Sequence, residues 1–539
     1  MVWASYERGD RRSSPMIGSG TAFTELEKIS KSLEVLQKKE KIVVQIGQCS
    51  HAVGAQDYIK SIVDNFSQTY EILEGGCDGA CFAAPRATCP ATSSTSDINE
   101  SLWALRGIES VPFIEFTESV DKFFADQFRI TLNDVGQLSW NGLGDYIESG
   151  GFKGLASALN RLPQEVIDVV SDSGLRGRGG AYFPVGDKWR STLSFSDHDS
   201  PTQVIINAEE GEPGIFKDRH LMEGMPYRVI EGALITAYAV SARDIYIYVN
   251  AEAELSYERL NYAVNNCIEN GLVGNNILGT HIDLNVHLMR GAGGYVCGEE
   301  STLINTMEGK RREPRLRPPF PTEAGLHDLP TVINNVETIC TLPFILREGF
   351  VALNTVGTAD VSGTKIVSLS GSIDRSGVAE VQMGTSLRSI IESIGGTNIE
   401  GNISAVAVGG PSSGILPTGK LDLNVGPGFI DGKNVMIGAG GIIALGINAE
   451  PLRMTALLSQ YNADESCGKC TPCREGTPRI YSLLREMEGL GDNVALSEKL
   501  KKLCITVNSA SLCGLGQAAG NPALSYLEYF AEKRLHSGD

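Results

Sequence analysis

VIINAEEGEPG, at residues 204–214, begins as a buried strand and ends as an acidic turn. Its first three residues are β-branched, and its end brings Glu209, Glu210 and Glu212 together beside glycine and proline, a pattern typical of a strand that runs into a loop. Neighbouring carboxylates repel one another unless they accept hydrogen bonds, and ribose hydroxyls or a carboxamide would supply the donors. A solvated acidic turn is the alternative for this stretch taken alone.

Strand-like and helical segments alternate around this stretch, over residues 166–350. Further strands are expected at 245–249 and 285–288, and helices at 227–240 and 251–270. This alternation predicts an α/β sheet whose ligand loops lie at the ends of its strands.

A second loop, SGLRGRGGA at residues 173–181, holds four glycines and two arginines and is followed by Phe183 and Lys188. Glycines let backbone N–H groups converge on an anion, and the cations add charge, so the composition indicates a phosphate cradle. It matches neither the P-loop nor the spaced three-glycine dinucleotide pattern. A mobile surface loop is the alternative.

Three further stretches carry related chemistry. The loop GAGGYVCGEE at 291–300 joins glycines to an aromatic ring and two carboxylates, residues 315–321 are stiff and basic, and residues 332–338 place paired amides at the start of a helix. Each alone is weak evidence. Together they predict a large polyanionic ligand with hydroxyls and flat rings.

Seven of the twelve cysteines fall into two groups with tight spacing, which in a reducing compartment favours metal over disulfide. The second group is a C-x2-C-x2-C run at Cys467, Cys470 and Cys473, with Cys513 further along the chain. Four thiolates so arranged suit a [4Fe–4S] cluster, and zinc is the competing occupant.

Five segments, taken in order, resemble the NADH-binding flavoprotein subunit of respiratory complex I: 173–189, 207–219, 291–300, 308–321 and 334–338. Relatives in soluble NAD-linked hydrogenases, formate dehydrogenases and electron-bifurcating complexes share these motifs. The resemblance implies a noncovalent FMN with a nicotinamide docked on its face. It also favours [4Fe–4S] over zinc at the second cysteine group.

The resemblance implies roles for individual residues. Hydride transfer requires no general base, so no acid or base is expected, and Glu210, Glu212 and Glu300 would position the nicotinamide. Phe183 and Phe320 would stack on the adenine, and the acidic lining would favour NAD over NADP. The expected cofactor-binding residues are Gly177, Arg178, Gly179, Phe183, Lys188, Asn207, Glu209, Glu210, Glu212, Tyr295, Gly298, Glu299, Glu300, Phe320, Asn334, Asn335 and Thr338.

The first cysteine group, Cys49, Cys77 and Cys81, resembles part of a thioredoxin-like [2Fe–2S] domain. That pattern needs a second cysteine shortly after the first, and residues 50–54 contain none. The three cysteines are therefore tentative [2Fe–2S] ligands, with Cys89 or His51 as candidates for the fourth position. A purely structural domain without a cluster is the alternative.

A multidomain α/β protein is therefore expected. The predicted order is an N-terminal helix at 1–38, a thioredoxin-like domain at 39–125, a Rossmann-like FMN- and NAD(H)-binding domain at 126–350, a β-grasp (ubiquitin-like) insert at 351–440, and a helical bundle with the [4Fe–4S] site at 441–539.

Composition excludes some functions. With 46 Lys and Arg against 65 Asp and Glu, the net charge of −19 argues against a nucleic-acid partner. The sequence shows neither a secretory signal nor an apolar run that would span a bilayer, so we expect a cytoplasmic protein.

The expected function is NADH:acceptor (diaphorase) activity, with electrons passing between NAD(H), FMN and the [4Fe–4S] cluster in either direction. Expected partners are a thioredoxin-like [2Fe–2S] small subunit and a larger iron–sulfur or catalytic subunit of a hydrogenase, a formate dehydrogenase or a similar enzyme.

Two alternatives remain open. An electron-transfer scaffold of the Rnf type shares a glycine loop and a β-grasp domain, but it carries two ferredoxin-like cysteine sets. An assembly subunit that binds flavin without NADH activity is the other. Tyr182 favours the second alternative, because it replaces a small residue that precedes Phe183 in the family motif.

Overall fold

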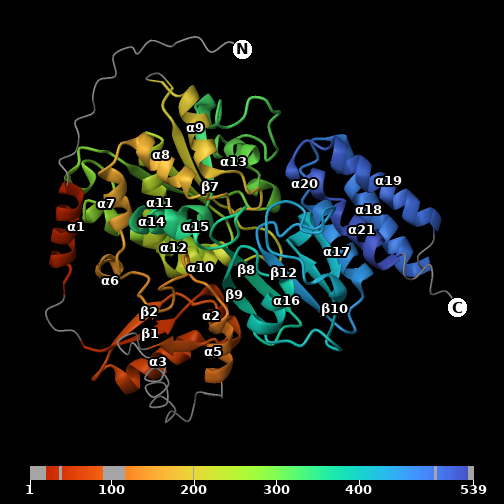
Figure 1. Cartoon of the computed structure of the whole chain (residues 1–539), viewed down its shortest axis with the longest axis horizontal. Helices are drawn as coiled ribbons and strands as arrows, with labels where there is room; N and C mark the ends of the chain where they lie inside the picture. Colours follow the sequence, from red (N-terminus) through yellow and green to blue (C-terminus); the bar gives the residue numbers. More distant parts are fainter. Residues whose placement is uncertain (1–19, 35–38, 89–115, 198–199, 491–493, 532–539) are drawn as a thin grey trace.

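The computed structural model describes residues 20–34, 39–88, 116–197, 200–490 and 494–531. Figure 1 shows a large α/β unit at the upper left, a small N-terminal unit below it, a second sheet near the centre and a group of helices at the right. Within these ranges, no helix combines the length and hydropathy that a membrane span requires. The multidomain α/β class predicted from the sequence is confirmed.

The large unit is built on a four-stranded parallel sheet with the order β6-β5-β4-β7. Val204 pairs with Ile245 on one side and with Val332 on the other. Because the four strands run in one direction, their carboxyl ends and the loops that follow meet at one edge. The strands are β4 (Gln203–Ala208), β5 (Asp244–Val249), β6 (Asn285–Arg290) and β7 (Thr331–Asn335).

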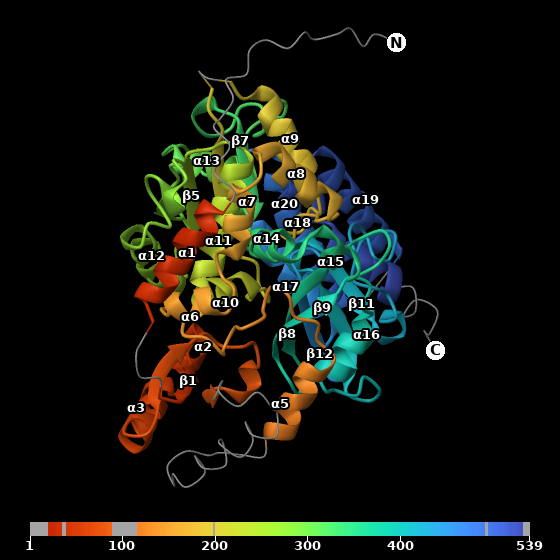
Figure 2. The ribbon, with the colours of Figure 1, turned by 60° about the vertical axis from the view of Figure 1, so that its left-hand side comes forward.

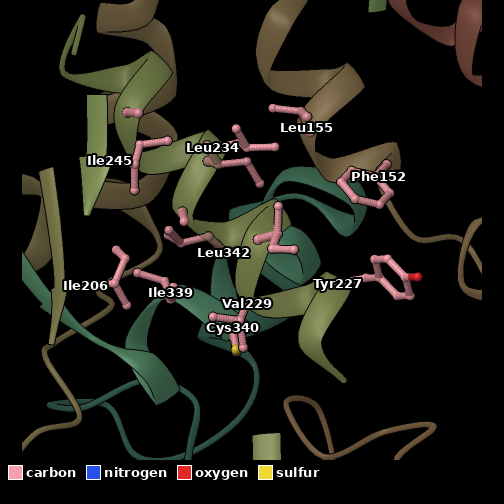
Figure 3. Close-up of a cluster of buried hydrophobic side chains, with 14 of the residues drawn as sticks. Phe152, Leu155, Ile206, Tyr227, Val229, Leu234, Ile245, Ile339, Cys340 and Leu342 are labelled. Carbon is pink, nitrogen blue, oxygen red and sulfur yellow. The ribbon is translucent and has the colours of Figure 1, made fainter. Parts of the chain in front are cut away.

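Helices cover both faces of this sheet. Successive residues of a strand point to opposite faces, so Ile206 joins the main core whereas Ile205 packs with Leu303 on the other face. Figure 3 shows the main core between β4, β5 and the helices α7, α11 and α14. The helices of the unit are α6 (Leu143–Glu148), α7 (Lys153–Leu159), α8 (Pro163–Asp172), α9 (Val185–Phe195), α10 (Lys217–Gly224), α11 (Pro226–Ala239), α12 (Glu254–Glu269), α13 (Glu300–Met307), α14 (Val336–Glu348) and α15 (Phe350–Asn354).

The N-terminal unit has a three-stranded sheet with the order β2-β1-β3, in which β2 is parallel and β3 antiparallel to β1. Figure 2 shows this sheet below α10, projecting from the rest of the molecule. Its elements are β1 (Lys41–Gln45), α2 (Gln48–Ala52), α3 (Ala55–Phe66), β2 (Glu71–Gly75), η1 (Cys81–Ala83) and β3 (Arg86–Thr88).

Two helices near this unit bury their apolar faces elsewhere. α1 (Thr21–Ser32) places Ala22 and Leu26 in the core of the large unit. α5 (Phe116–Ala125) lies inside the range expected for the thioredoxin-like domain, but Phe123 packs in the core of the second sheet. The chain between the N-terminal and large units therefore also holds the second sheet in place.

The second sheet has five strands in the order β11-β10-β12-β8-β9. Its last strand, β12, lies beyond the boundary expected at residue 440, because it pairs in parallel with β8 and antiparallel with β10 and so completes the sheet. The elements are β8 (Thr364–Gly371), β9 (Gly377–Gln382), α16 (Leu387–Ser389), η6 (Ile390–Ile394), β10 (Ile403–Val408), η7 (Gly410–Ser412), β11 (Gly414–Pro417) and β12 (Gly441–Gly446). We call this part the insert.

The C-terminal part is helical and packs against the insert. Ser525 Oγ accepts a hydrogen bond from the Ile415 backbone N–H (2.9 Å), and Asn521 Nδ2 donates to the Ser412 carbonyl oxygen (3.0 Å). The helices are α17 (Pro451–Asp464), α18 (Thr471–Leu490), α19 (Val494–Ala510), α20 (Gly514–Ala518) and α21 (Asn521–Tyr526).

One buried carboxylate anchors the start of the large unit to the insert. Glu380 of β9 is fully buried and accepts the backbone N–H groups of Ile130 (3.0 Å), Thr131 (3.0 Å) and Leu132 (2.8 Å). The carboxylate thus satisfies three donors that the segment 130–132 would otherwise leave buried without an acceptor.

We expect Glu380→Ala to lower the midpoint of thermal unfolding by about 5 °C or more. Each buried donor left without its acceptor costs about 1–3 kcal/mol, and a domain of this size loses roughly 2–4 °C per kcal/mol. Differential scanning fluorimetry measures the change. Glu400→Ala, at an exposed glutamate of the same insert, is the control, and equal midpoints for the two variants would contradict the anchoring role.

Candidate functional site

The expected ligand loops converge at the carboxyl edge of the parallel sheet. The glycine loop between α8 and α9 reaches this edge, because the Arg178 backbone N–H donates to Thr338 Oγ1 (2.8 Å) just after β7. A Cβ atom at Gly179 would lie 3.1 Å from Cβ of Asn335, so glycine permits this approach. Segments far apart in the sequence thus meet at this edge of the sheet.

Two cations of the glycine loop and of α9 point toward backbone carbonyl groups. The buried guanidinium of Arg178 donates to the carbonyl oxygens of Arg176 (3.1 Å) and Ser362 (2.7 Å). Lys188 Nζ donates to the Ile333 carbonyl oxygen (3.0 Å), and burial lowers its pKa. Arg178 therefore shapes the loop, whereas the Lys188 ammonium retains donors for a bound anion.

The paired amides at the end of β7 fix neighbouring helices. Asn334 Oδ1 accepts a hydrogen bond from Trp189 Nε1 (3.1 Å). Asn335 caps α14 by accepting the Glu337 backbone N–H (3.0 Å), and its Nδ2 donates to Asp218 Oδ2 (2.6 Å). Both amides thus hold the site's framework together.

Glu209, at the end of β4, has a buried oxygen available for a ligand. Its Oε1 accepts a hydrogen bond from Asn250 Nδ2 (2.5 Å), whereas Oε2 is buried and has no hydrogen-bond partner among the described residues. Burial raises the pKa of Glu209 to about 7. Nearby, Asn207 Nδ2 donates to the Gly298 carbonyl oxygen (2.8 Å) and joins the acidic turn to the 291–300 loop. An unpaired buried carboxylate oxygen here fits a ligand that brings a hydroxyl or amide donor.

The two other glutamates of the acidic turn have partners within the protein. Glu210 accepts the backbone N–H groups of Asp218 (2.8 Å) and Arg219 (3.1 Å) at the start of α10. Glu212 accepts a hydrogen bond from the Tyr295 hydroxyl (3.4 Å), and burial raises its pKa to about 8. Glu210 therefore orients a helix, and Glu212 joins two loops of the site.

The two carboxylates at the end of the 291–300 loop share one arginine partner. Glu299 caps α13 by accepting the backbone N–H groups of Ser301 (3.1 Å) and Thr302 (2.8 Å). Arg317 forms ion pairs with Glu299 and, at 3.0 Å, with Glu300. The basic segment 315–321 is thereby held over the start of α13.

The aromatic residues next to the glycine loop differ in exposure. Phe183 is 51% exposed and Phe320 is 47% exposed, so both rings are accessible to a flat partner. Tyr182 is instead buried in the apolar core of the insert. The ring of Tyr182, which follows the glycine loop in the sequence, therefore fills the core of the insert.

The second cysteine group lies together at the start of α18 and α20. Cys467, Cys470, Cys473 and Cys513 share one cluster with Val296 and Leu515. The fold thus brings the three cysteines of the short run together with the distant Cys513, as a [4Fe–4S] cluster with four thiolate ligands requires.

The 291–300 loop also contacts this cysteine cluster directly. Val296 and Tyr295 pack against the cysteines, and the Tyr295 backbone N–H donates to Glu465 Oε2 (2.8 Å), two residues before Cys467. Tyr461 of α17 donates through its hydroxyl to the Gly211 carbonyl oxygen (2.6 Å) in the acidic turn. The 291–300 loop and the acidic turn thus lie next to the four cysteines.

The first cysteine group is arranged differently from the tentative set. Sγ of Cys77, Sγ of Cys81 and a ring nitrogen of His220 all lie within 4.8 Å of one another. Cys49 is exposed and lies outside this group, 4.0 Å from Nη2 of Arg219. His51 is also exposed, and Cys89 lies outside the described residues.

Several residues of the site belong to no motif that sequence reasoning singled out. Asn250 follows β5 at the same edge as the acidic turn, so strand order is a signal that could have found it. His220 and Tyr461 reach their partners only through tertiary packing, and no local pattern marks them.

These features define a class of protein: an oxidoreductase that binds a nucleotide-like cofactor beside an iron–sulfur cluster. Two family descriptions match the chain, "Nuo51 FMN-binding domain" at residues 170–343 and "NADH-ubiquinone oxidoreductase-F iron-sulfur binding region" at residues 453–536. The first covers the site's loops and the second covers all four cysteines. The expected FMN and [4Fe–4S] regions are confirmed.

Known proteins agree with this class. The chain is 40% identical over 409 residues to NADP-reducing hydrogenase subunit HndC of Solidesulfovibrio fructosivorans, covering 76% of this chain and 83% of the relative. It is 37% identical over 403 residues to the F 2 subunit of the NADH-quinone oxidoreductase of Rhizobium meliloti, covering 74% and 95%. A crystal structure of NAD+-reducing [NiFe]-hydrogenase in the H2-reduced state aligns with a TM-score of 0.65 and 26% identity, covering 95% of this chain and 87% of that chain.

The chain belongs to the family of NADH-binding FMN flavoprotein subunits with a [4Fe–4S] region, which includes the F subunits of NADH-quinone oxidoreductases and their hydrogenase relatives. It is thus an oxidoreductase subunit of the NADH-dehydrogenase type, and the relatives named above are subunits of larger complexes.

Glu209 gives the site a testable pH dependence. Because its pKa rises from the ordinary 4.5 to about 7 on folding, the folded protein holds a proton that the unfolded chain releases, and stability falls as the pH rises through this interval. We expect Glu209→Gln to make the fall in the thermal-unfolding midpoint between about pH 5 and pH 7 shallower. Glu258→Gln, at an exposed glutamate of α12, is the control, and identical slopes in all three proteins would contradict the burial of Glu209.

Proposed function

We propose that the chain is an NADH:acceptor oxidoreductase (diaphorase) that takes electrons from NADH and passes them to the thiolate-bound cluster. One observation carries the proposal: the 291–300 loop contributes to the cofactor space through its bond to Asn207 and also packs Val296 against the cysteines. A donor site and an acceptor site that share one short loop are close enough for electrons to pass. FMN, when bound, exchanges hydride with nicotinamide and single electrons with an iron–sulfur cluster.

The residues present fit an FMN. Gly177, Gly179 and the Arg178 backbone form a close turn beside Thr338, and Lys188 offers an ammonium group toward an anion. The buried Oε2 of Glu209 lacks a donor that a ribityl hydroxyl or a carboxamide would supply. We assign the remaining expected contacts, Asn207, Tyr295, Gly298, Glu299, Asn334 and Asn335, to shaping this space, because each of their side chains or carbonyl groups holds a neighbouring segment.

The nicotinamide nucleotide would lie on the open side of this space. Three glutamates are expected to position it. Glu212 contacts Tyr295 of the 291–300 loop and Glu300 contacts Arg317 of the basic segment, whereas Glu210 contacts the backbone at the start of α10 and would act by orienting that helix. Phe183 and Phe320 are accessible for adenine stacking. The acidic lining of the site would disfavour the extra phosphate of NADP, so we propose NAD(H) rather than NADP(H) as the substrate.

We also propose a setting for this activity. The named relatives are subunits of a hydrogenase and of a quinone oxidoreductase, so a larger iron–sulfur or catalytic subunit and a thioredoxin-like [2Fe–2S] small subunit are the proposed partners, and the cytoplasm is the proposed location. One group of four clustered thiolates in the described chain does not match the two ferredoxin-like sets of an Rnf-type scaffold.

The direct test is the reaction of the full-length chain with NADH. We expect protein purified without oxygen and loaded with FMN to lose its oxidised-flavin absorbance on addition of NADH, and to reduce ferricyanide with a higher kcat/KM for NADH than for NADPH. Flavin that NADH fails to bleach would overturn the proposal and favour the assembly subunit.

Phe320 tests the adenine site. We expect Phe320→Ala to raise the KM for NADH about 2- to 10-fold with little change in kcat, because an aromatic stack contributes about 0.5–1.5 kcal/mol to binding alone. Phe195→Ala is the matched control, since Phe195 is also 47% exposed but lies at the far end of α9. Equal KM values for both variants would place the adenine elsewhere.

A further inference from the structure

Three potential metal ligands from two units of the protein meet at one point. Cys77 follows β2, Cys81 begins η1, and His220 comes from α10 of the large unit, yet their ligand atoms all lie within 4.8 Å of one another. Sγ of Cys81 lies 3.6 Å from Nε2 of His220. Two thiols and an imidazole at this spacing form a set that zinc prefers.

The loop that carries both cysteines is fixed on two sides. A Cβ atom at Gly76 would lie 2.1 Å from Cα of Gly224, at the end of α10, and one at Gly79 would lie 2.2 Å from the carbonyl oxygen of Val378 in the insert. The Val378 backbone N–H donates to the Gly79 carbonyl oxygen (2.8 Å). The cysteines are therefore held at the junction of three units, facing His220, rather than on a free surface loop.

The imidazole of His220 is already oriented as in a metal ligand. Nδ1 lies 2.9 Å from the carbonyl oxygen of Phe216, an acceptor that fixes the proton on Nδ1 and leaves the Nε2 lone pair facing Cys81. Metal-bound histidines typically donate their second N–H to such a carbonyl group. His220 is only 7% exposed, so an imidazole nitrogen aimed at two thiols is shielded from water.

The spacing fits one ion and not a two-iron cluster. Around a single zinc ion, sulfur and nitrogen ligands lie about 3.5–3.8 Å apart, close to the separation of Cys81 and His220. A [2Fe–2S] cluster needs four ligands divided between two irons, and ligands on opposite irons are further apart than those on one ion. Among the described residues, these three ligand atoms form one compact group, and Cys49 stands outside it.

We propose that Cys77, Cys81 and His220 bind a single divalent ion of the zinc class, and that this ion joins the N-terminal unit to α10. A fourth position is left for Cys49 or a solvent molecule. Zinc is redox-inactive. The ion therefore fastens the N-terminal unit to α10 and takes no part in electron transfer. This proposal is independent of NADH oxidation, because the metal content is measured on protein that need not turn over.

The test uses full-length protein purified without oxygen, with zinc and iron counted by mass spectrometry and the zinc site examined by X-ray absorption at the zinc edge. That edge is specific for zinc, so the iron of the C-terminal cluster does not interfere. We expect one zinc per chain, and a first shell of two or three sulfurs at about 2.3 Å with at least one nitrogen at about 2.0 Å. Two sulfurs indicate solvent in the fourth position, and three indicate Cys49.

Variants test which residues bind the ion. We expect His220→Gln and Cys81→Ser each to lose the zinc on dialysis against a chelator that leaves the wild type loaded, while both keep the C-terminal iron. His51→Ala is the control, because His51 is an exposed histidine of the same N-terminal unit and should retain zinc. If a variant fails to fold, the absorption spectrum of the wild type decides the question alone.

Several results would overturn the proposal. The first is iron and sulfide in excess of the C-terminal [4Fe–4S] cluster, by two of each per chain, that disappears with Cys81→Ser. The second is zinc that is bound by oxygen and nitrogen only or that stays bound in His220→Gln. The third is a protein without metal at this site whose Cys77 and Cys81 form a disulfide.

Discussion

The site depends on a buried ion cluster below the converging loops. Lys217 is fully buried, with its ammonium group 2.6 Å from Asp218 Oδ1 and 2.9 Å from Glu337 Oε2, and Glu337 also pairs with the buried Lys365 of the insert. Burial alone would lower the pKa of Lys217, but the surrounding carboxylates raise it. Charges removed from water in this way persist only when each keeps its partner, so α10, α14 and β8 are fixed relative to one another.

This cluster sets the positions of the strand ends that form the site. Asn335 at the end of β7 donates to Asp218, and Glu210 after β4 accepts the first backbone N–H groups of α10. The insert is part of the same arrangement, since Lys365 belongs to its first strand. The insert thus completes the wall of the cofactor site by packing against Tyr182 and by placing Ser412 next to Tyr295.

Local patterns predicted the framework well. The β-branched run before Asn207 is β4, and Cys467, Cys470 and Cys473 lie together with Cys513 as their spacing predicted. Strands and closely spaced cysteines are encoded over a few residues. The partners of individual carboxylates were beyond such reasoning. Glu299 directly precedes α13, whereas Glu210 lies in the turn after β4 and reaches the first N–H groups of α10 only through folding. A carboxylate that caps a helix has the same sequence signature as one that binds a ligand.

Tertiary contacts explain the other differences. His220 lies in the middle of α10. It becomes a candidate metal ligand only because the loop after β2 packs on the end of this helix. Tyr182 stands beside the glycine loop in sequence, yet its ring lies in the core of the insert. In both cases a second unit, distant in the sequence, decides the role of the residue.

The central claim is that electrons from NADH reach the cluster at Cys467, Cys470, Cys473 and Cys513 within this one chain. Electron paramagnetic resonance of the isolated, FMN-loaded protein after addition of NADH tests it most directly. We expect a reduced [4Fe–4S] signal that is absent from Cys513→Ser, in which the flavin still bleaches. A wild-type protein whose flavin is reduced by NADH while no cluster signal develops, even though dithionite produces one, would contradict the claim.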